Sequence, residues 1–188
     1  MDAADRSLIA DWRDATEGRL LDAGCGPGLW TEFLHDGFRD VIGVDISEEF
    51  LASARRTHPH LTFQSASFRA LPVADASLGG ILAWYSLIHT PPDEIPAVLA
   101  EFARALSPGG SLLIGFFDGP PREPFDHAIT RAYFWSVDAL GELLESAGFT
   151  ITQQERRART AAEVSTRPHA ALTAKRHPGP FDRLRDRD

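Results

Sequence analysis

Short apolar runs alternate with segments in which apolar residues recur every three or four positions. The runs lie at residues 19–23, 41–44, 61–63, 78–84 and 111–117. Runs this short and continuous are typical of strands buried on both faces of a parallel sheet. Strands that alternate with helical patterns at this spacing predict a doubly wound, mostly parallel α/β sheet.

Helix signals fill the segments between the runs. We expect helices over residues 3–17, from Leu29 to Gly37, from Ser47 to about residue 57, and over 136–147. Ser47 is a good N-cap, and glycine is a common helix stop. A further helix opens at Pro91, and its apolar face consists of Ile95, Val98, Leu99, Phe102 and Leu106. The sequence Ser107-Pro-Gly-Gly110 ends that helix.

The last third of the chain is less regular. Residues 118–135 show no clear period, and residues 149–155 and 169–175 predict two final strands. Together these elements predict one domain over residues 1–178, and residues 179–188 form a frayed tail.

Composition and charge limit the possible partners. With 188 residues, of which 43% are hydrophobic, the chain suits one domain with a buried core. Residues 1–150 hold 22 acidic side chains against 10 Lys and Arg, whereas residues 151–188 hold 5 against 9. The acidic body makes nucleic acid an unlikely partner, because phosphates are contacted mostly by Lys and Arg. The basic C-terminal segment is either a solvated edge or a nucleic-acid contact.

Cysteine use and hydropathy suggest a cellular location. Cys25 is the single cysteine, which suits a reducing compartment, and the N-terminus is acidic where a signal peptide is basic. No apolar run approaches the roughly 20 residues that span a bilayer. We therefore expect a cytoplasmic protein without a membrane segment.

The most informative stretch is Leu20-Leu-Asp-Ala-Gly-Cys-Gly-Pro-Gly28, a strand followed by a glycine-rich turn. A phosphate-binding P-loop needs a lysine after the glycines, and the only lysine in the chain is Lys175. A dinucleotide site needs a third glycine, but the two possible frames place Leu29 or Thr31 there. Both phosphate-binding loops are therefore excluded.

Two acidic residues indicate a different nucleotide. Asp22 ends the first strand, where it repels a pyrophosphate and attracts an ammonium or sulfonium. Asp45 ends the second strand, 21 residues after Gly24, and its two oxygens can accept from both ribose hydroxyls. Ile46 then lies beside the adenine. These residues suit a ligand that joins adenosine to a cationic amino-acid arm.

The sequence here resembles the class I S-adenosylmethionine (SAM)-dependent methyltransferases. The glycine-rich stretch is similar to their first motif, Val41-Ile-Gly-Val-Asp-Ile-Ser47 to their second, and Ala66-Ser-Phe-Arg-Ala-Leu-Pro72 to their adenine-contacting third. Ser67 departs from the acid often found in the third motif. The resemblance covers residues 19–175, and it implies a Rossmann-like, seven-stranded sheet with the last strand antiparallel. It also implies SAM as cofactor and S-adenosylhomocysteine as product.

The predicted cofactor-binding residues combine these arguments. They are Asp22, Gly24, Cys25, Gly26, Trp30, Thr31, Asp45, Ile46, Ser67, Phe68, Trp84 and Tyr85. Cys25 is expected to fill space between glycines rather than to react. Trp30 either covers the cofactor or packs in the core. The resemblance implies backbone contacts from Trp84 and Tyr85 to the amino-acid arm.

Catalytic candidates come from the residues after the fourth strand and from the irregular segment. His89 is either a general base or a histidine hydrogen-bonded at a helix entry. The aromatic-rich stretch with His127 and Tyr133 is either a substrate-pocket wall or a small separate core. Arg167 and His169, at the start of the last strand, either reach an anionic group of the substrate or face solvent, and the second role is favoured. No metal site is expected.

The expected function is methyl transfer to a small molecule, with oxygen favoured slightly over nitrogen or sulfur. The Asn/Asp-Pro-Pro-Tyr sequence of enzymes that methylate nucleobase or amide nitrogens is absent; residues 83–86 read Ala-Trp-Tyr-Ser. Two alternatives stay open: an RNA methyltransferase that uses the basic C-terminal segment, and a SAM-binding protein without turnover. The chain is expected to act as a monomer or homodimer.

Overall fold

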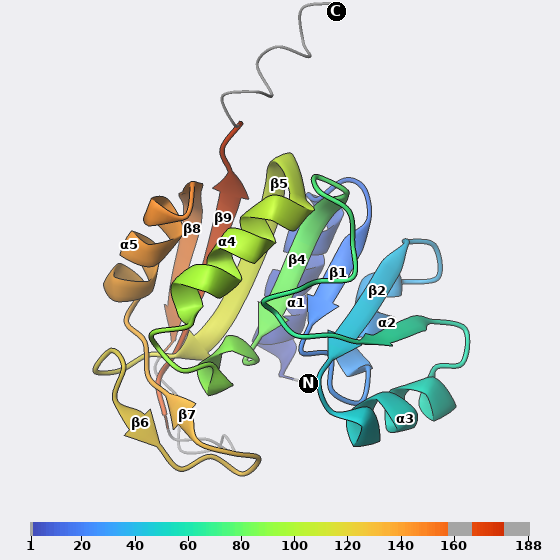
Figure 1. The fold of residues 1–188 in the computed structure, drawn as a ribbon, viewed down its shortest axis with the longest axis horizontal. Helices are drawn as coiled ribbons and strands as arrows, with labels where there is room; N and C mark the ends of the chain where they lie inside the picture. The colour runs from blue at the N-terminus through green and yellow to red at the C-terminus, as the bar shows by residue number, and fades with distance from the viewer. Residues whose placement is uncertain (1, 158–166, 179–188) are drawn as a thin grey trace, which may run out of the picture.

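A mixed sheet of seven strands forms the centre of the computed structural model, which describes residues 2–157 and 167–178 (Figure 1). The strands are β1 (Leu20–Ala23), β2 (Val41–Asp45), β3 (Thr62–Ser65), β4 (Leu78–Trp84), β5 (Leu106–Phe117), β8 (Phe149–Arg157) and β9 (His169–Arg176). Their order across the sheet is β3-β2-β1-β4-β5-β9-β8. The first five are parallel, and β9 runs antiparallel to both neighbours, which confirms the predicted sheet. The predicted tail, 179–188, lies outside the described residues.

Helices cover both faces of the sheet. They are α1 (Ala3–Asp14), α2 (Leu29–His35), α3 (Glu48–Thr57), α4 (Ile95–Ala105) and α5 (Val137–Ser146). In Figure 1, α4 and α5 lie in front of the sheet and α1 lies behind it. The predicted cap of α3 is confirmed, because the Ser47 hydroxyl accepts a hydrogen bond from the Phe50 amide at 3.3 Å. None of the described helices has the length and apolarity needed to cross a bilayer.

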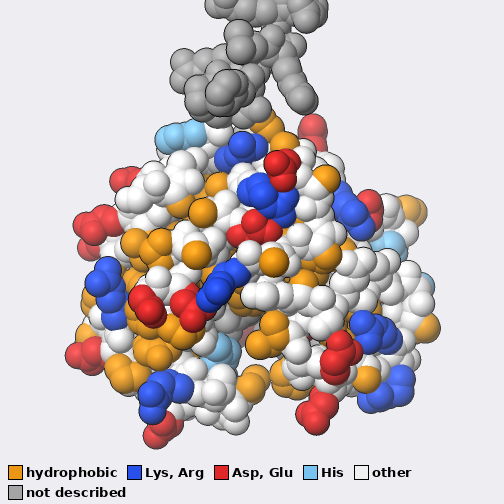
Figure 2. All heavy atoms as spheres, viewed as in Figure 1, with side chains coloured by type: hydrophobic (Ala, Val, Ile, Leu, Met, Phe, Trp, Pro, Cys, Tyr) orange, Lys and Arg blue, Asp and Glu red, His pale blue; other side chains and the backbone are white. Residues whose placement is uncertain are grey.

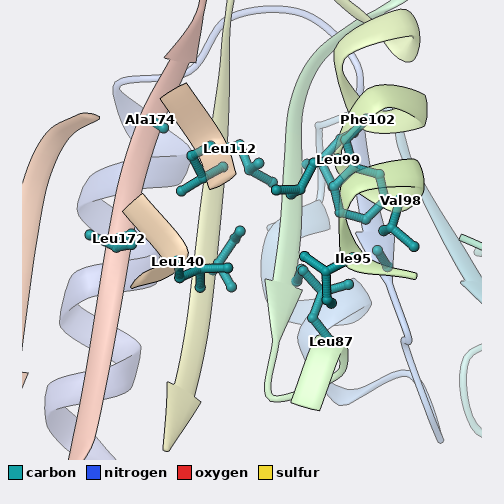
Figure 3. Close-up of a cluster of buried hydrophobic side chains, with 14 of the residues drawn as sticks. Leu87, Ile95, Val98, Leu99, Phe102, Leu112, Leu140, Leu172 and Ala174 are labelled. Atoms are coloured by element: carbon teal, nitrogen blue, oxygen red, sulfur yellow. The ribbon is translucent and has the colours of Figure 1, made fainter. Parts of the chain in front are cut away.

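Neighbouring residues on each strand pack against opposite layers of helices. Leu21, Ile81 and Leu112 share a core with α4 and α5, which includes Phe102 and Leu140 (Figure 3). Leu20, Leu82 and Leu113 instead share a core with α1 and α2. Successive side chains on a strand point to opposite faces, so a strand covered on both sides must be apolar throughout. This explains the unbroken apolar runs of the sequence.

The structure corrects the predicted start and end of the fourth helix. Helix α4 begins at Ile95 rather than Pro91. Leu106 is not on the helix, because it begins β5 and pairs with Leu78 of β4. Residues 107–110 therefore continue the strand, through a register shift next to Gly109, which has a positive φ of 75°. A β-bulge of this kind is not visible as an apolar run, which is why the predicted strand was shorter.

The segment 118–135, expected to be irregular, contains a small antiparallel pair. Its strands are β6 (Pro124–Phe125) and β7 (Ala132–Tyr133). With two residues each, they are too short to show an alternating pattern. In Figure 1 this pair lies below the carboxyl ends of the parallel strands, on the opposite side from α3.

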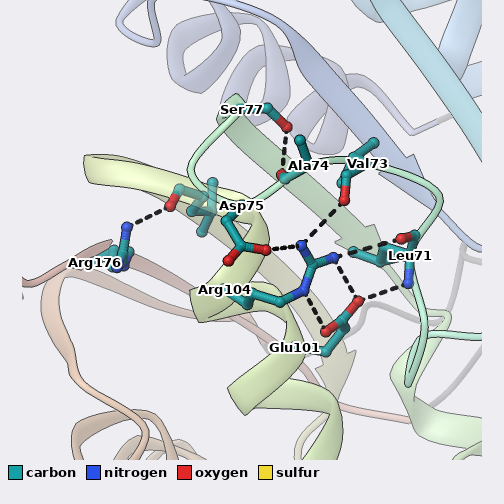
Figure 4. Close-up of polar contacts among 9 residues, drawn as sticks. Leu71, Val73, Ala74, Asp75, Ser77, Glu101, Arg104 and Arg176 are labelled. Atoms are coloured by element: carbon teal, nitrogen blue, oxygen red, sulfur yellow. Dashed lines mark hydrogen bonds and ion pairs between the residues drawn. The ribbon is translucent and has the colours of Figure 1, made fainter.

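Arg104 of α4 fixes the long loop between β3 and β4. Its guanidinium donates to the carbonyls of Leu71 and Val73, and it pairs with Asp75 at 2.6 Å and Glu101 at 2.7 Å (Figure 4). Glu101 in turn accepts from the Leu71 amide at 2.7 Å. These bonds satisfy backbone groups that no strand satisfies, so they hold the loop that carries Ser67 and Phe68.

We predict that Arg104→Ala lowers the free energy of unfolding by about 1–3 kcal/mol, because it removes the donor to the Val73 carbonyl, one of two donors to the Leu71 carbonyl, and the ion pair with Glu101. The measurement is urea denaturation followed by circular dichroism. Arg156→Ala is the matched control, since Arg156 pairs with the exposed Asp138 and an exposed pair contributes about 0–1 kcal/mol. Equal losses in the two variants would contradict this role of Arg104.

Candidate functional site

A cavity of about 600 Å³ opens at the carboxyl ends of the parallel strands. Its walls come from the loops after β1, β2, β3 and β4, and from the segment between β6 and β7. Figure 2 shows a hollow in this part of the molecule, with hydrophobic side chains and a histidine around it. The volume lies in the range of about 300–1,000 Å³ that small-molecule sites occupy, and the position is the usual one in open α/β sheets.

The glycine turn after β1 forms the floor of the cavity. The amides of Gly24 and Cys25 both donate to the Val44 carbonyl, at 2.8 and 3.0 Å. Gly24 has a φ of +78°, and a Cβ on it would lie 2.3 Å from the Cβ of Ser86. Gly26 has a φ of +51°, but a Cβ there would meet no atom within 4 Å. The fold therefore requires glycine at position 24, because a side chain there would clash with Ser86. Glycine at position 26 instead leaves open space at the cavity.

Asp45 joins the turn to the next helix. One carboxylate oxygen accepts from the Gly26 amide at 2.9 Å, and the other accepts from the Ser47 amide at 2.9 Å. Each oxygen keeps a further lone pair. Because Asp45 also lines the cavity, its carboxylate can accept hydrogen bonds from a bound molecule without losing either backbone bond.

Asp22 lies beneath the turn rather than in the cavity wall. Its side chain is buried, and it accepts a hydrogen bond from the Thr31 hydroxyl at 2.7 Å. Burial raises the pKa of Asp22 to about 7, the Asp45 charge adds to the rise, and the bonds from Thr31 oppose it. Asp22 and Thr31 thus form a buried pair that ties β1 to α2.

Cys25 lines the cavity as a buried thiol. Burial raises the pKa of the thiol far above its ordinary value, and the charges of Asp22 and Asp45 raise it further. A thiolate is the reactive form of cysteine, so this thiol is a poor nucleophile. The arrangement agrees with a space-filling role.

Three residues at the cavity present buried polar atoms without hydrogen-bond partners. These atoms are Trp84 Nε1, Ser86 Oγ and His127 Nδ1, and all three residues line the cavity. Buried polar atoms in proteins are nearly always paired, so each unpaired one needs an explanation. Because all three residues line one cavity, they are candidates for contact with a molecule bound there.

Tyr85 has a strained backbone at the centre of this wall. Its φ is +53°, a conformation that costs a non-glycine residue energy and is common at functional sites. Its amide donates to the Gly115 carbonyl at 3.0 Å, and its hydroxyl is hydrogen-bonded to Nδ1 of His169. The structure therefore corrects the prediction for His169, which is buried against Tyr85 and Phe117 instead of facing solvent.

His89 and His127 lie together at the other side of the cavity. Their ring centroids are 5.1 Å apart. His89 ends the 3₁₀ turn η1 (Leu87–His89), and its Nδ1 lies 3.1 Å from the carbonyl oxygen of Arg131. Burial lowers the pKa of His127, and the nearby His89 and Arg167 lower it further. His127 is therefore neutral at pH 7.

Residues from the loops after β2 and β3 form the opposite side. Ile46 is 75% exposed at the cavity rim, and Ser67 and Phe68 line the wall beside it. The Ser67 hydroxyl accepts from the Arg69 amide at 3.2 Å. Trp30 lines the cavity and also packs edge-on against Trp84, with ring centroids 6.3 Å apart.

Most of the residues selected from the sequence meet at this cavity. It is lined by Gly24, Cys25, Gly26, Trp30, Asp45, Ile46, Ser67, Phe68, Trp84, Tyr85, His89 and His127. Asp22 and Thr31 are not in its wall, because they pair beneath the turn. Tyr133 is not in its wall either, because it pairs with Pro124 in the β6–β7 sheet.

Four further residues line the cavity that were not predicted from the sequence: Phe50, Ser86, Ile129 and Thr130. Ser86 directly follows Trp84 and Tyr85, which were predicted, so its position in the sequence could have indicated that it lines the cavity. The others lie on a helix and on an irregular segment, where spacing gives no signal. In residues 2–157 and 167–178, no group of histidine, cysteine and carboxylate side chains is placed to hold a metal ion.

Comparison with known proteins agrees with this geometry. Residues 20–110 match the family described as "Methyltransferase domain". The chain is 31% identical over 136 residues to the demethylmenaquinone methyltransferase of Renibacterium salmoninarum, covering 72% of this chain and 56% of that protein. It is 29% identical over 154 residues to the malonyl-[acyl-carrier protein] O-methyltransferase of Erwinia billingiae, covering 78% and 61%. The chain thus spans little more than half the length of these curated relatives.

The chain is also similar to a methyltransferase of known structure. The 1,6-didemethyltoxoflavin-N1-methyltransferase of Burkholderia thailandensis, solved with 1,6-didemethyltoxoflavin and S-adenosylhomocysteine bound, superposes with a TM-score of 0.76. It is 28% identical, and the match covers 92% of this chain and 77% of that one. Together, sheet, site and relatives identify this chain as carrying a class I SAM-dependent methyltransferase domain. The cofactor of that family is SAM.

The buried pair beneath the turn predicts a pH dependence of stability. Asp22 has a folded-state pKa of about 7 against an ordinary value of 3.8, so between these pH values the folded state holds a proton that the unfolded state has lost. The stabilisation that protonated Asp22 contributes is therefore fully present below about pH 4. It falls as pH rises toward 7, by up to about 1.4 kcal/mol per pH unit.

Asp22→Asn should remove this dependence while keeping an acceptor for Thr31. We expect the variant to gain stability relative to the wild type as pH rises from 4 to 7, measured by thermal unfolding at several pH values. A constant difference between the two proteins would show that Asp22 titrates normally.

Proposed function

We propose that this chain transfers a methyl group from SAM to a small-molecule acceptor, with oxygen favoured over nitrogen or sulfur. The observation that carries the proposal is the combination of Asp45 and the unpaired Ser86 Oγ in one cavity beside an open glycine turn. The Asp45 carboxylate suits two ribose hydroxyls, and the Ser86 hydroxyl suits a polar group on the amino-acid arm. Bound SAM supplies a methyl group on a positively charged sulfur.

The residues of the chain hold the two halves of the cofactor on either side of β1. Asp45 and Ile46 lie at the end of β2, where they contact the ribose and adenine. Gly26 leaves room for the backbone to be approached closely. Ser86 and Trp84, after β4, offer a hydroxyl and an indole N–H to the amino-acid arm. The remaining side of the cavity, with His89 and His127, is left for the acceptor.

The acceptor is proposed to be a small molecule because of the cavity and its charges. Among the described residues that line it, Arg69 is the single Lys or Arg, and it pairs with Glu94 at 2.9 Å. Phosphate contacts of a nucleic acid depend on several unpaired cations. Named relatives methylate different atoms, oxygen in the malonyl-[acyl-carrier protein] enzyme and N1 in the toxoflavin enzyme.

The cofactor assignment is tested by calorimetric titration with S-adenosylhomocysteine. Ser86→Ala should bind it about 5- to 10-fold more weakly, as expected for one lost hydrogen bond, with unchanged thermal stability, because the hydroxyl has no partner in the protein. Asp45→Ala should reduce binding more strongly. Asp40→Ala is the matched control, since Asp40 is a surface residue paired with Arg19. Unchanged affinity in both Ser86→Ala and Asp45→Ala would refute the assignment.

The activity is tested by incubating the protein and labelled SAM with a metabolite extract and with total RNA. We expect label in a small molecule identified by mass spectrometry. Label that enters RNA alone would refute the small-molecule acceptor. Tight cofactor binding without any transfer would instead support a binding protein without turnover.

A further inference from the structure

We propose that the acceptor end of the cavity, defined here by Tyr85, His89, His127 and Ile129, recognises an uncharged aromatic ring that carries a hydroxyl group. His89 accepts the hydroxyl proton. This inference rests on the proposed function, and it names the acceptor class that the proposed function leaves open.

The first support is the tautomer of His89. Its Nδ1 lies 3.1 Å from the Arg131 carbonyl oxygen, and a carbonyl can only accept. Nδ1 therefore carries the proton, and neutral His89 has its lone pair on Nε2. A histidine held in this way by a backbone carbonyl is ready to accept a proton from a neighbouring group.

The second support is the unpaired nitrogen of His127. Its Nδ1 is buried and has no partner, and its ring lies beside that of His89. A hydroxyl oxygen can donate its proton to His89 and still accept from, or pair with, the second imidazole. A ring N–H can only donate, and a carboxylate can only accept. A hydroxyl therefore satisfies both histidines when His127 carries its proton on Nδ1, whereas a carboxylate cannot donate to His89.

The third support is the aromatic wall behind these residues. Phe117 packs against Tyr85 at 5.1 Å, His127 at 5.9 Å and Phe125 at 5.4 Å between ring centroids. Ile129, which is 63% exposed, adds an apolar surface at the rim. Phe117 is not itself part of the lining, but it packs against the rings of Tyr85 and His127, which are, and aromatic lining residues favour an aromatic acceptor.

Charge excludes the main alternatives. The charged residues in the described wall are Asp45, on the ribose side, and the ion pair of Arg69 and Glu94. Arg167 lies near His127, but its guanidinium stacks over Phe125 at 4.6 Å and bonds the Asp126 carbonyl. The acceptor end thus offers no unpaired carboxylate for an ammonium group, and its histidines are arranged to accept protons.

The proton of the acceptor hydroxyl moves to His89. The O–H bond of the acceptor breaks as the N–H bond at His89 Nε2 forms, so the acceptor oxygen gains the electron pair and His89 becomes an imidazolium. The imidazolium later releases this proton to solvent. No oxidant, reductant or metal takes part.

The test uses three planar probes of the same shape: 4-nitrophenol, 4-nitroaniline and 4-nitrobenzoate. Each is titrated into the full chain saturated with S-adenosylhomocysteine, and binding is followed by absorbance. We expect 4-nitrophenol to bind about tenfold more tightly than the other two, the effect of one good hydrogen bond. Its bound spectrum should shift toward that of the phenolate, because His89 takes the proton.

His89→Gln should abolish both the preference and the spectral shift, and His127→Gln should weaken the preference. His60→Gln is the matched control, because His60 is an exposed histidine that contacts Glu32 away from the cavity. Equal binding of the three probes, preference for 4-nitrobenzoate, or no binding of any probe would overturn the proposal. Failure of S-adenosylhomocysteine to bind would instead refute the proposed function, and the probe titration is then read on the protein alone.

Discussion

The carboxylate of Asp45 is the interaction on which the site depends. It accepts one backbone amide from the turn after β1 and another from the start of α3, so it fixes two loops that meet only because β1 and β2 are adjacent. A carboxylate bonded to backbone amides is held in one orientation. The same group that would bind a ribose is therefore also the group that shapes the floor of the cavity, and the two roles cannot be separated by a substitution at Asp45 alone.

The parts of the site that could be predicted from the sequence are those coded by local spacing. The glycine turn, Asp45 and the Trp84–Tyr85 pair each follow directly after an apolar run, and parallel strands bring their carboxyl ends to one edge. The sheet itself was predictable for the same reason, since each run is buried on both faces. The predicted secondary structure was wrong or incomplete where a strand does not follow a regular apolar pattern. Examples are the bulge near Gly109 and the two-residue strands β6 and β7.

Contacts between distant segments could not be predicted from the sequence. Asp22 was expected to face a cation, but the Thr31 hydroxyl in the first turn of α2 donates to its carboxylate, and burial raises its pKa to about 7. The bond between Tyr85 and His169 joins residues 84 positions apart. No spacing rule links such residues, because their distance is set by the order of β4, β5 and β9 in the sheet. The contact between His89 and His127 likewise depends on how η1 and the segment before β7 pack.

The position of β9 has a consequence for the order in which the molecule is completed. A chain synthesised as far as residue 157 contains β8, but β8 has no neighbour with which to pair, because β9 lies between it and β5. The glycine turn and Asp45 need only the first strands, so the cofactor side can assemble early. Tyr85, in contrast, acquires its partner His169 only when the last strand enters the sheet. The acceptor side of the cavity, which contains Tyr85, thus depends on a strand that is synthesised after all the other strands, whereas the two backbone bonds of Asp45 do not.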